Sequence, residues 1–414
     1  MRASHIAHVV FIGLWASACA SPDAPLSSMP SADSVDGATF DVASSAGAPD
    51  FGEPLADLTP DELARFNAGL AEFLEEDGID EGLGPVFNEA ACATCHNAPV
   101  GGTTGRVETR FGRVVNGVFD PLAEFGGSLI QDQGIGLVST GGDFTFAAEV
   151  VHATATVTAG RITTPLFGLG LVDAVSDAQL LQLARREAAL SPATAGTPSF
   201  VQEIRTGLTR VGRFGWKAQV PTLFQFSGDA YLNEMGITNP EFPNENCPQG
   251  DCASLAHNPM PGLNDDGAGV VAFADFMTLL APPPRAPSSI VVVQGRGIFG
   301  AIGCANCHTP TLVTGPSPVA ALSNKVFQPF SDFLLHDMGS LGDGIVQGSA
   351  TGRQMRTAPL WGLRTRALLL HDGRATTIPQ AIRFHAGQGV ASRNRFLRLS
   401  AFERYALLRF LRTL

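Results

Sequence analysis

The pattern Cys-x-x-Cys-His occurs twice in the chain, at residues 92–96 and 304–308. Two thiols at positions i and i+3 can form thioether bonds to the two vinyl groups of a porphyrin, and the histidine that follows can then bind the iron. The sequence therefore predicts two covalently attached haem c groups. The residues expected to attach and ligate them are Cys92, Cys95 and His96 for the first haem, and Cys304, Cys307 and His308 for the second.

Three other interpretations of the two motifs remain open. Each could be a thioredoxin-like redox couple, but neither lies in an alternating strand and helix pattern. The four thiols could hold one structural zinc ion, but that would leave both adjacent histidines unexplained. Two surface disulfides would leave them unexplained as well. Haem attachment is the interpretation that uses all the residues of the motif.

The other three of the seven cysteines need separate explanations. Cys19 follows small residues at the end of a short apolar run, and it would carry a lipid or leave with a signal peptide. Cys247 and Cys252 are separated by Pro, Gln, Gly and Asp, and they can form a short-loop disulfide in an oxidising compartment. Two free thiols are the alternative.

The N-terminus predicts export. Residues 1–19 have the form of a signal peptide, and Ala16–Cys19 resembles a bacterial lipobox, although an ordinary cleavage near Ala18 or Ala20 is the alternative. Residues 20–57 are rich in Ser, Ala, Pro, Asp and Gly, and they are expected to form a flexible tether. The chain is thus expected outside the cytoplasm, in the periplasm, attached to a bacterial membrane through an N-terminal lipid.

The rest of the chain predicts a mainly α fold of two cytochrome c-like haem domains with long irregular loops. Thr59–Glu62 is a capping box with Pro at the first helical position, and Ser400–Glu403 caps a helix at the other end. Helix, CxxCH motif, loops and closing helix follow one another twice. A Pro-rich stretch separates the copies, which places the domains at residues 58–285 and 286–414.

The formal net charge of -12 argues against two classes of partner. Nucleic acid and anionic membrane surfaces both require clustered positive charge, and the chain has no Lys/Arg-rich stripe. We expect no nucleic-acid partner, and membrane contact only through the lipid. A basic redox partner is compatible with the charge.

Several long segments resemble one family. They are GPVFNEAACATCH, PLFGLGLVDA, GRFGWKAQVPTLFQFSGDAYLNEMGITNPEFPNENC, LLHDMGS and RTAPLWGLRTRALLLHDGRATTIPQAIRFHAGQG. In this order they resemble the bacterial di-haem oxidoreductases, also labelled peroxidases or thiol oxidoreductases, which are similar to di-haem cytochrome c peroxidases and to MauG. The resemblance covers most of residues 82–414. No residue here identifies a thiol substrate.

The resemblance implies a sixth ligand for the second haem. In the related peroxidases a ligand lies fourteen positions after the histidine of the His-Asp-Gly element, which here is His371, and that position is His385. His385 would give a bis-histidine iron, unless it is a surface histidine. Met338 and Met355 are the rivals, because thioether sulfur is a common sixth ligand in cytochromes c.

The resemblance also bears on the first haem. Glu234 begins a Glu-Met-Gly element that resembles the one beside the open iron site of the peroxidases, so Glu234 is expected to act as a general acid/base on peroxide, the alternative being a solvated turn residue. No histidine matches their displaceable ligand; His152 is the next in sequence. Arg366 and Leu368 replace calcium-binding residues, which puts calcium in doubt. Trp216 does not align with the inter-haem tryptophan and is given no relay role.

The resemblance predicts a peroxidase-like oxidoreductase with two haems. Electrons would pass from a small redox donor protein or a quinol-linked cytochrome through the second haem to the first, where peroxide or another substrate reacts. The alternative is a non-catalytic di-haem electron-transfer protein, in which both irons are six-coordinate. A five-coordinate first haem would favour the enzyme.

Overall fold

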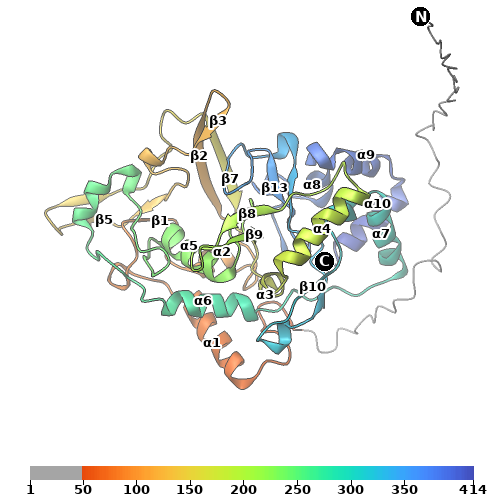
Figure 1. The fold of residues 1–414 in the computed structure, drawn as a ribbon, viewed down its shortest axis with the longest axis horizontal. Helices are drawn as coiled ribbons and strands as arrows, with labels where there is room; N and C mark the ends of the chain where they lie inside the picture. Colours follow the sequence, from red (N-terminus) through yellow and green to blue (C-terminus); the bar gives the residue numbers. More distant parts are fainter. Residues whose placement is uncertain (1–48) are drawn as a thin grey trace, which may run out of the picture. The chain divides into compact units, whose positions relative to one another are not determined.

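The computed structural model describes residues 49–414 (Figure 1). The predicted signal peptide, the lipobox at Cys19 and most of the predicted tether lie outside the described residues. Where the tether stretch is described, the Leu55 N–H donates to the Leu279 carbonyl at 2.8 Å. Within residues 49–414, no helix has the length and apolar character needed to cross a membrane.

The expected mainly α fold is wrong. The structure is 36% helical and 16% strand, with several small sheets, so its class is mixed. The error has a physical source, because the Gly-rich stretch between the first CxxCH motif and residue 220 pairs into hairpins rather than staying irregular. Its alternation of outward and inward residues is short and interrupted, which makes it a weak strand signal.

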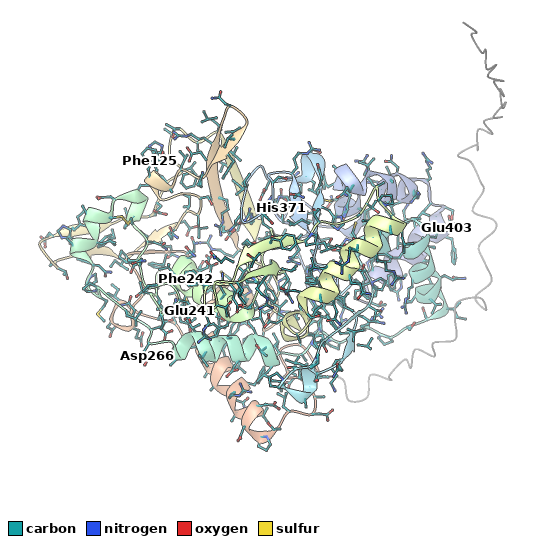
Figure 2. The ribbon with its side chains drawn as sticks, viewed as in Figure 1. Phe125, Glu241, Phe242, Asp266, His371 and Glu403 are labelled. Carbon is teal, nitrogen blue, oxygen red and sulfur yellow. A yellow bond between two sulfur atoms is a disulfide. The ribbon has the colours of Figure 1, made fainter. Side chains whose placement is uncertain are left out.

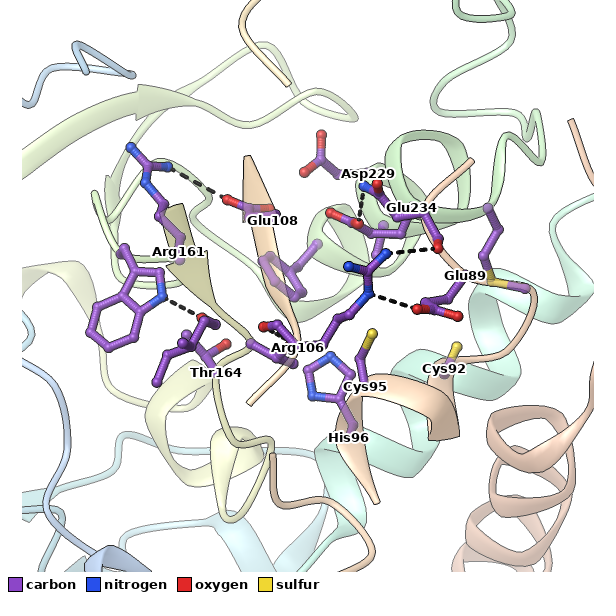
Figure 3. A pocket seen from close by; sticks show the side chains of 18 of the residues that line it. Glu89, Cys92, Cys95, His96, Arg106, Glu108, Arg161, Thr164, Asp229 and Glu234 are labelled. Atoms are coloured by element: carbon purple, nitrogen blue, oxygen red, sulfur yellow. Dashed lines mark hydrogen bonds and ion pairs between the residues drawn. The ribbon is translucent and has the colours of Figure 1, made fainter. Parts of the chain in front are cut away.

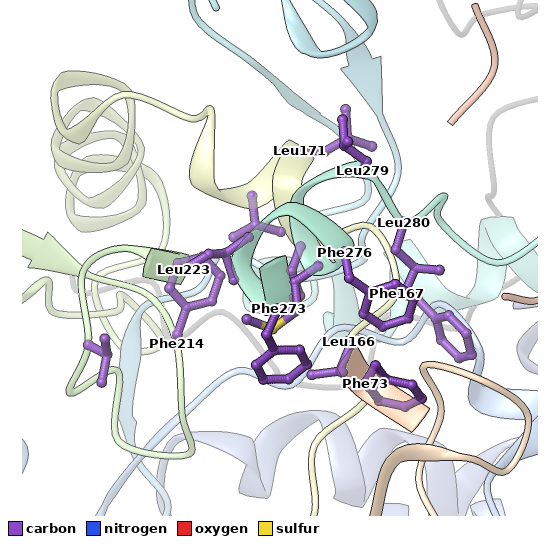
Figure 4. Close-up of a cluster of buried hydrophobic side chains, with 14 of the residues drawn as sticks. Phe73, Leu166, Phe167, Leu171, Phe214, Leu223, Phe273, Phe276, Leu279 and Leu280 are labelled. Atoms are coloured by element: carbon purple, nitrogen blue, oxygen red, sulfur yellow. The ribbon is translucent and has the colours of Figure 1, made fainter. Parts of the chain in front are cut away.

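Three helices form the first helical layer: α1 (Pro60–Leu74), α5 (Leu223–Met235) and α6 (Ala268–Leu279). The capping box predicted at the start of α1 is confirmed, since the Thr59 side chain accepts from the Glu62 N–H. α1 and α6 pack closely because Gly69 has no side chain; a Cβ there would lie 2.1 Å from the Ala272 carbonyl oxygen. Phe73 stacks on Phe276 with ring centroids 4.7 Å apart, inside the larger hydrophobic core (Figure 4).

A second helical layer belongs to the C-terminal part of the chain. It consists of α7 (Ile290–Ala301), α8 (Ile378–Phe384), α9 (Val390–Arg398) and α10 (Ala401–Leu411). The predicted cap of α10 is confirmed by the bond from the Glu403 N–H to the Ser400 hydroxyl. Gly295 permits close packing of α7 on α10, because a Cβ there would lie 2.0 Å from the Ala406 carbonyl oxygen.

In the described part of the chain, three further α-helices and nine 3-10 turns connect these layers. The helices are α2 (Cys92–His96), α3 (Leu169–Asp173) and α4 (Asp177–Leu190). The 3-10 turns are η3 (Ile79–Glu81), η4 (Ala123–Phe125), η5 (Pro248–Gly250), η6 (Cys252–His257), η7 (Cys304–Asn306), η8 (Ala320–Leu322), η9 (Gly339–Leu341), η10 (Leu363–Thr365) and η11 (Gly387–Gly389).

The described strands form one three-stranded and five two-stranded antiparallel sheets. The three-stranded sheet has the order β3-β2-β7, formed by β2 (Val107–Val115), β3 (Val118–Asp120) and β7 (Val157–Ile162). The pairs are β1 (Val86–Phe87) with β4 (Gln133–Gly134), β5 (Gly136–Val138) with β6 (Phe144–Phe146), β8 (Ser199–Gln202) with β9 (Thr209–Gly212), β10 (Leu312–Val313) with β11 (Val326–Phe327), and β12 (Leu335–Asp337) with β13 (Gln354–Arg356).

The register of β2 against β7 positions charged side chains that matter for the first site. Glu108 lies opposite Arg161, and Arg110 lies opposite Ala159. Residues two apart on a strand point to the same face, so Glu108 and Arg110 project together.

Backbone hydrogen bonds join the two predicted halves of the chain. The Ile162 N–H donates to the His371 carbonyl at 2.6 Å, and the Arg356 N–H donates to the Trp216 carbonyl at 2.9 Å. The two halves therefore lie against each other within one unit. The domain boundary near residue 286 stays a prediction.

The described cysteines fall into two groups. Cys247 and Cys252 form a disulfide, as expected from their spacing. The other four, the pairs of the two CxxCH motifs, are free thiols. They are the thiols that haem attachment would use.

Candidate functional site

Each CxxCH motif opens into its own cavity. The first cavity has about 1070 Å³ of space free of protein atoms, including its opening to solvent. α2 supplies Cys92, Cys95 and His96, while β2, β7 and α5 supply the facing wall. Figure 3 shows the CxxCH side chains on one side of this cavity and three carboxylates, Glu108, Asp229 and Glu234, on the other.

His96 has the chemistry of a metal ligand. Burial lowers its pKa to about 4, so the imidazole is neutral and keeps a lone pair near pH 7. Its Nδ1 is buried and has no hydrogen-bond partner among the described residues. A buried, neutral imidazole beside two free thiols fits the ligand of a haem iron.

Each arginine of the first cavity is paired with a carboxylate. Arg110 binds Glu108 at 2.9 Å and Arg161 binds Asp343 at 2.8 Å. Arg106 lies 2.6 Å from Glu89 and 2.7 Å from Asp132. The positive charges are thus balanced within the protein itself.

Two carboxyl groups in the first cavity influence each other's pKa. Glu234 accepts from the Asn88 amide at 2.8 Å, and burial, followed by the charge of Glu108, raises the pKa of Glu234 to about 7. Burial by itself would raise the pKa of Glu108, but Arg110, Arg161 and the hydrogen bond with Glu234 lower it overall. Glu234 is therefore protonated at low pH, and its carboxylate form appears as the pH rises through about 7.

The second cavity is larger and more apolar. It has about 1490 Å³ free of protein atoms, including its opening, and contains Cys304, Cys307 and His308 in its lining. His308 Nδ1 lies 3.0 Å from the Phe330 carbonyl oxygen, and burial lowers its pKa to about 4. A histidine held through Nδ1 by a backbone carbonyl presents Nε2 for metal binding.

His385 faces His308 across the second cavity. His385 Nδ1 lies 2.9 Å from the Ala381 carbonyl oxygen, so its Nε2 is also free, and burial lowers its pKa. The two ring centroids are 6.4 Å apart. Two imidazoles that each bind one metal ion at about 2 Å have centroids separated by roughly 6 Å. The spacing fits one iron between them.

Met338 and Met355, the rivals of His385, also line the second cavity. The assignment of the sixth ligand to His385 therefore stays a prediction, which the separation of the two histidines supports. His152 lines neither cavity; it stacks on Phe125 with ring centroids 3.7 Å apart, and Figure 2 shows Phe125 at the margin, away from His371.

The wall that separates the two cavities was not predicted from the sequence. Ile162, Thr163 and Trp216 line both of them. The Trp216 indole N–H donates to the Ile162 carbonyl at 2.8 Å, and its ring lies 6.2 Å from that of His371. Trp216 was given no relay role because it does not align with the family's tryptophan, yet packing between the halves brings it to this position.

The sequence also missed a buried pair beside Cys307. His336 Nε2 lies 2.8 Å from an Asp332 carboxylate oxygen, and Nδ1 lies 3.5 Å from the Cys307 sulfur. These three residues form a cluster of metal-ligand type, but Cys307 belongs to the CxxCH motif. Only the LLHDMGS segment could have pointed to His336.

Two cavities, each lined by the cysteines and the histidine of a CxxCH motif, are typical of a haem-binding redox protein. Residues 148–414 match the family described as "Di-haem oxidoreductase, putative peroxidase". The chain belongs to this di-haem oxidoreductase family, whose members carry haem and have peroxidase-like redox function. The matched residues include the second CxxCH motif but not the first.

Two solved structures share weaker similarity with the chain. A MauG-like protein associated with microbial copper homeostasis is 15% identical, with a TM-score of 0.41 over 89% of this chain and 94% of that one. Kuenenia stuttgartiensis hydrazine synthase is 13% identical, with a TM-score of 0.36 over 91% of this chain and 98% of that one. Neither similarity is high enough to bear on function. No curated protein matches the chain.

Proposed function

We propose that the protein is a peroxidase-like enzyme with one haem c in each cavity. The observation that carries this proposal is the difference in ligands. His96 is the only histidine among the described residues that line the first cavity, whereas His308 and His385 face each other in the second. Met235 lines the first cavity but is 4% exposed and packs within the hydrophobic core. From this difference we infer that the first iron would have a free sixth coordination position for substrate, whereas both axial positions of the second iron would be occupied by histidines.

Glu234 and Glu108 supply the proton chemistry of the first cavity. Reduction of hydrogen peroxide to two waters consumes two protons and two electrons. Haem supplies the redox chemistry when bound. The Glu234 carboxylate takes the proton from one peroxide oxygen and returns it to the other, and Glu108, held by Arg110, accepts a hydrogen bond from Glu234 while it is protonated.

The second cavity is the proposed entry point for electrons. A small redox donor protein or a quinol-linked cytochrome would dock outside the second cavity, and the net charge of -12 suits a basic donor. Trp216 lies in the wall common to both cavities and is the proposed contact between them. Export and an N-terminal lipid would place the protein where such donors are found.

Optical and EPR spectra of the haem-loaded protein test this proposal. Expression in a host that attaches haem c should give a mass gain of two porphyrins. The oxidised protein should then show one high-spin and one low-spin signal, and peroxide should consume the high-spin signal. Two low-spin signals that are indifferent to peroxide would instead identify an electron-transfer protein.

A further inference from the structure

The second cavity contains buried positive charge that the protein does not balance. None of the described residues lining it is Asp or Glu, but Arg356 and Arg366 both face it. Neither arginine forms an ion pair with any carboxylate of residues 49–414. A buried unpaired cation is costly, so a partner with negative charge is expected there.

Arg356 is fixed in position by backbone carbonyls. Its Nε donates to the Gly215 carbonyl at 2.7 Å, and Nη1 donates to the Thr357 carbonyl at 3.0 Å. The residue is 7% exposed, and its guanidinium lies 5.6 Å from the centre of the Phe333 ring. These bonds hold the guanidinium at the cavity wall without neutralising it.

Arg366 is held in a similar way. Its Nη2 donates to the Pro359 and Trp361 carbonyls, both at 2.9 Å. Its Nε is buried and has no hydrogen-bond partner among the described residues. A guanidinium whose planar fork is only partly used retains donors for a carboxylate.

The two guanidinium groups also repel each other. Burial lowers the pKa of Arg366 to about 10. Burial, followed by the charge of Arg366, lowers the pKa of Arg356 to about 10 as well, although Asp332 acts in the opposite direction. A ligand with two negative charges would offset the free-energy cost of burying the two guanidinium groups and the repulsion between them.

From this geometry we infer that Arg356 and Arg366 bind the two propionate carboxylates of the haem in the second cavity. Haem carries two propionates, so its charges match the two deeply buried arginines, and guanidinium groups bind carboxylates through two parallel hydrogen bonds. The inference rests on the proposed haem in this cavity. A third lining arginine, Arg393, is half-buried. It donates to the His385 carbonyl at 3.0 Å, so we assign it to holding the backbone at His385 rather than to binding a propionate.

The arginines should raise the reduction potential of the second haem. Reduction adds one negative charge to the haem, and fixed positive charge beside it favours that gain. Loss of either cation should lower the potential, and a lysine in its place should preserve most of it. The first haem should respond much less, because the arginines of its cavity are already paired.

The test uses the full-length, haem-loaded protein with Arg356→Met, Arg366→Met and the two corresponding lysine variants. Spectroelectrochemical titration should show a lower potential for the second haem in each methionine variant, and a potential near that of the parent in each lysine variant. Resonance Raman bands of the propionate groups should shift in the methionine variants. Arg353→Gln is the matched control, since Arg353 is 65% exposed and paired with Asp337.

The possible failures can be told apart. A parent protein with one porphyrin would contradict the proposed function. Two porphyrins, with propionate bands and a second-haem potential that ignore all four substitutions, would overturn only the arginine inference. If one methionine variant does not mature, the other decides, because each arginine is expected to bind its own propionate: propionate bands and a second-haem potential equal to those of the parent would reject direct binding.

Discussion

The two cavities share an attachment motif and differ in almost everything else. The first is lined by carboxylates, and each of its arginines is paired within the protein. The second is apolar, with two histidines facing each other and two deeply buried arginines that pair with no carboxylate of the described residues. The motif thus predicts where a haem is attached, and we propose that the wall opposite the motif determines whether the site exchanges protons or only electrons.

The largest expected effect is at Glu234. Glu234→Gln should lower kcat for peroxide reduction by about 10²–10⁴-fold, because it removes the group that moves the proton. Stopped-flow kinetics would measure it. The exposed Glu76→Gln is the surface control. Full activity of Glu234→Gln would remove the proposed distinction between the cavities.

The second prediction tests whether His385 is the sixth ligand of the second haem. His385→Ala should convert the second haem from low to high spin, because it removes one of two facing imidazoles. EPR would then show two high-spin signals instead of one. Met338→Leu should leave the spectrum unchanged; if Met338→Leu changes the spin state and His385→Ala does not, the ligand is the methionine.

The third prediction concerns pH. Because the carboxylate form of Glu234 takes the proton, kcat/KM should rise with pH and level off above about 7, and Glu234→Gln should lack this inflection. The folded-state pKa lies above the ordinary value of 4.5, so the protonated form stabilises the fold at low pH, and this contribution is lost as the pH rises through about 7. A flat profile in the parent protein would contradict the assignment.

The smallest effects concern the helix pairs that support the cavities. Gly69→Ala and Gly295→Ala should each lower the free energy of unfolding by roughly 1–3 kcal/mol, because the added Cβ meets a backbone oxygen. Gly297→Ala should instead raise it by roughly 0.5–1 kcal/mol, since that exposed helical position has open space. Denaturant titration would measure all three. Equal effects would mean that the helices do not pack as described.

Local signals in the sequence were enough for some parts of the fold. The capping boxes at Thr59 and Ser400 depend on contacts three residues apart, so their helices could be predicted. The pairing of β2 with β7 could not, because the two strands are separated by more than forty residues and their pairing depends on burial that only the whole fold provides.

The sites show the same limit. The CxxCH residues lie within five consecutive positions, so their role in haem attachment could be predicted from the sequence alone. Glu108, Trp216 and Arg356 acquire their positions through contacts between distant segments. Trp216 and Arg356 lie in segments that resemble the family, but no local pattern indicates what these three side chains face. Glu234 and His385 were proposed only through family resemblance, and both line the expected cavities.

The wall formed by Ile162, Thr163 and Trp216 makes the second cavity depend on residues from the first half of the chain. These residues precede the predicted boundary at 286, yet they close the cavity of the second CxxCH motif. A fragment that starts at residue 286 would keep both thiols of that motif but would leave one edge of a porphyrin bound there open to water. We therefore expect that neither half can be exchanged as an independent module, and that recombination within this family should preserve the two halves together.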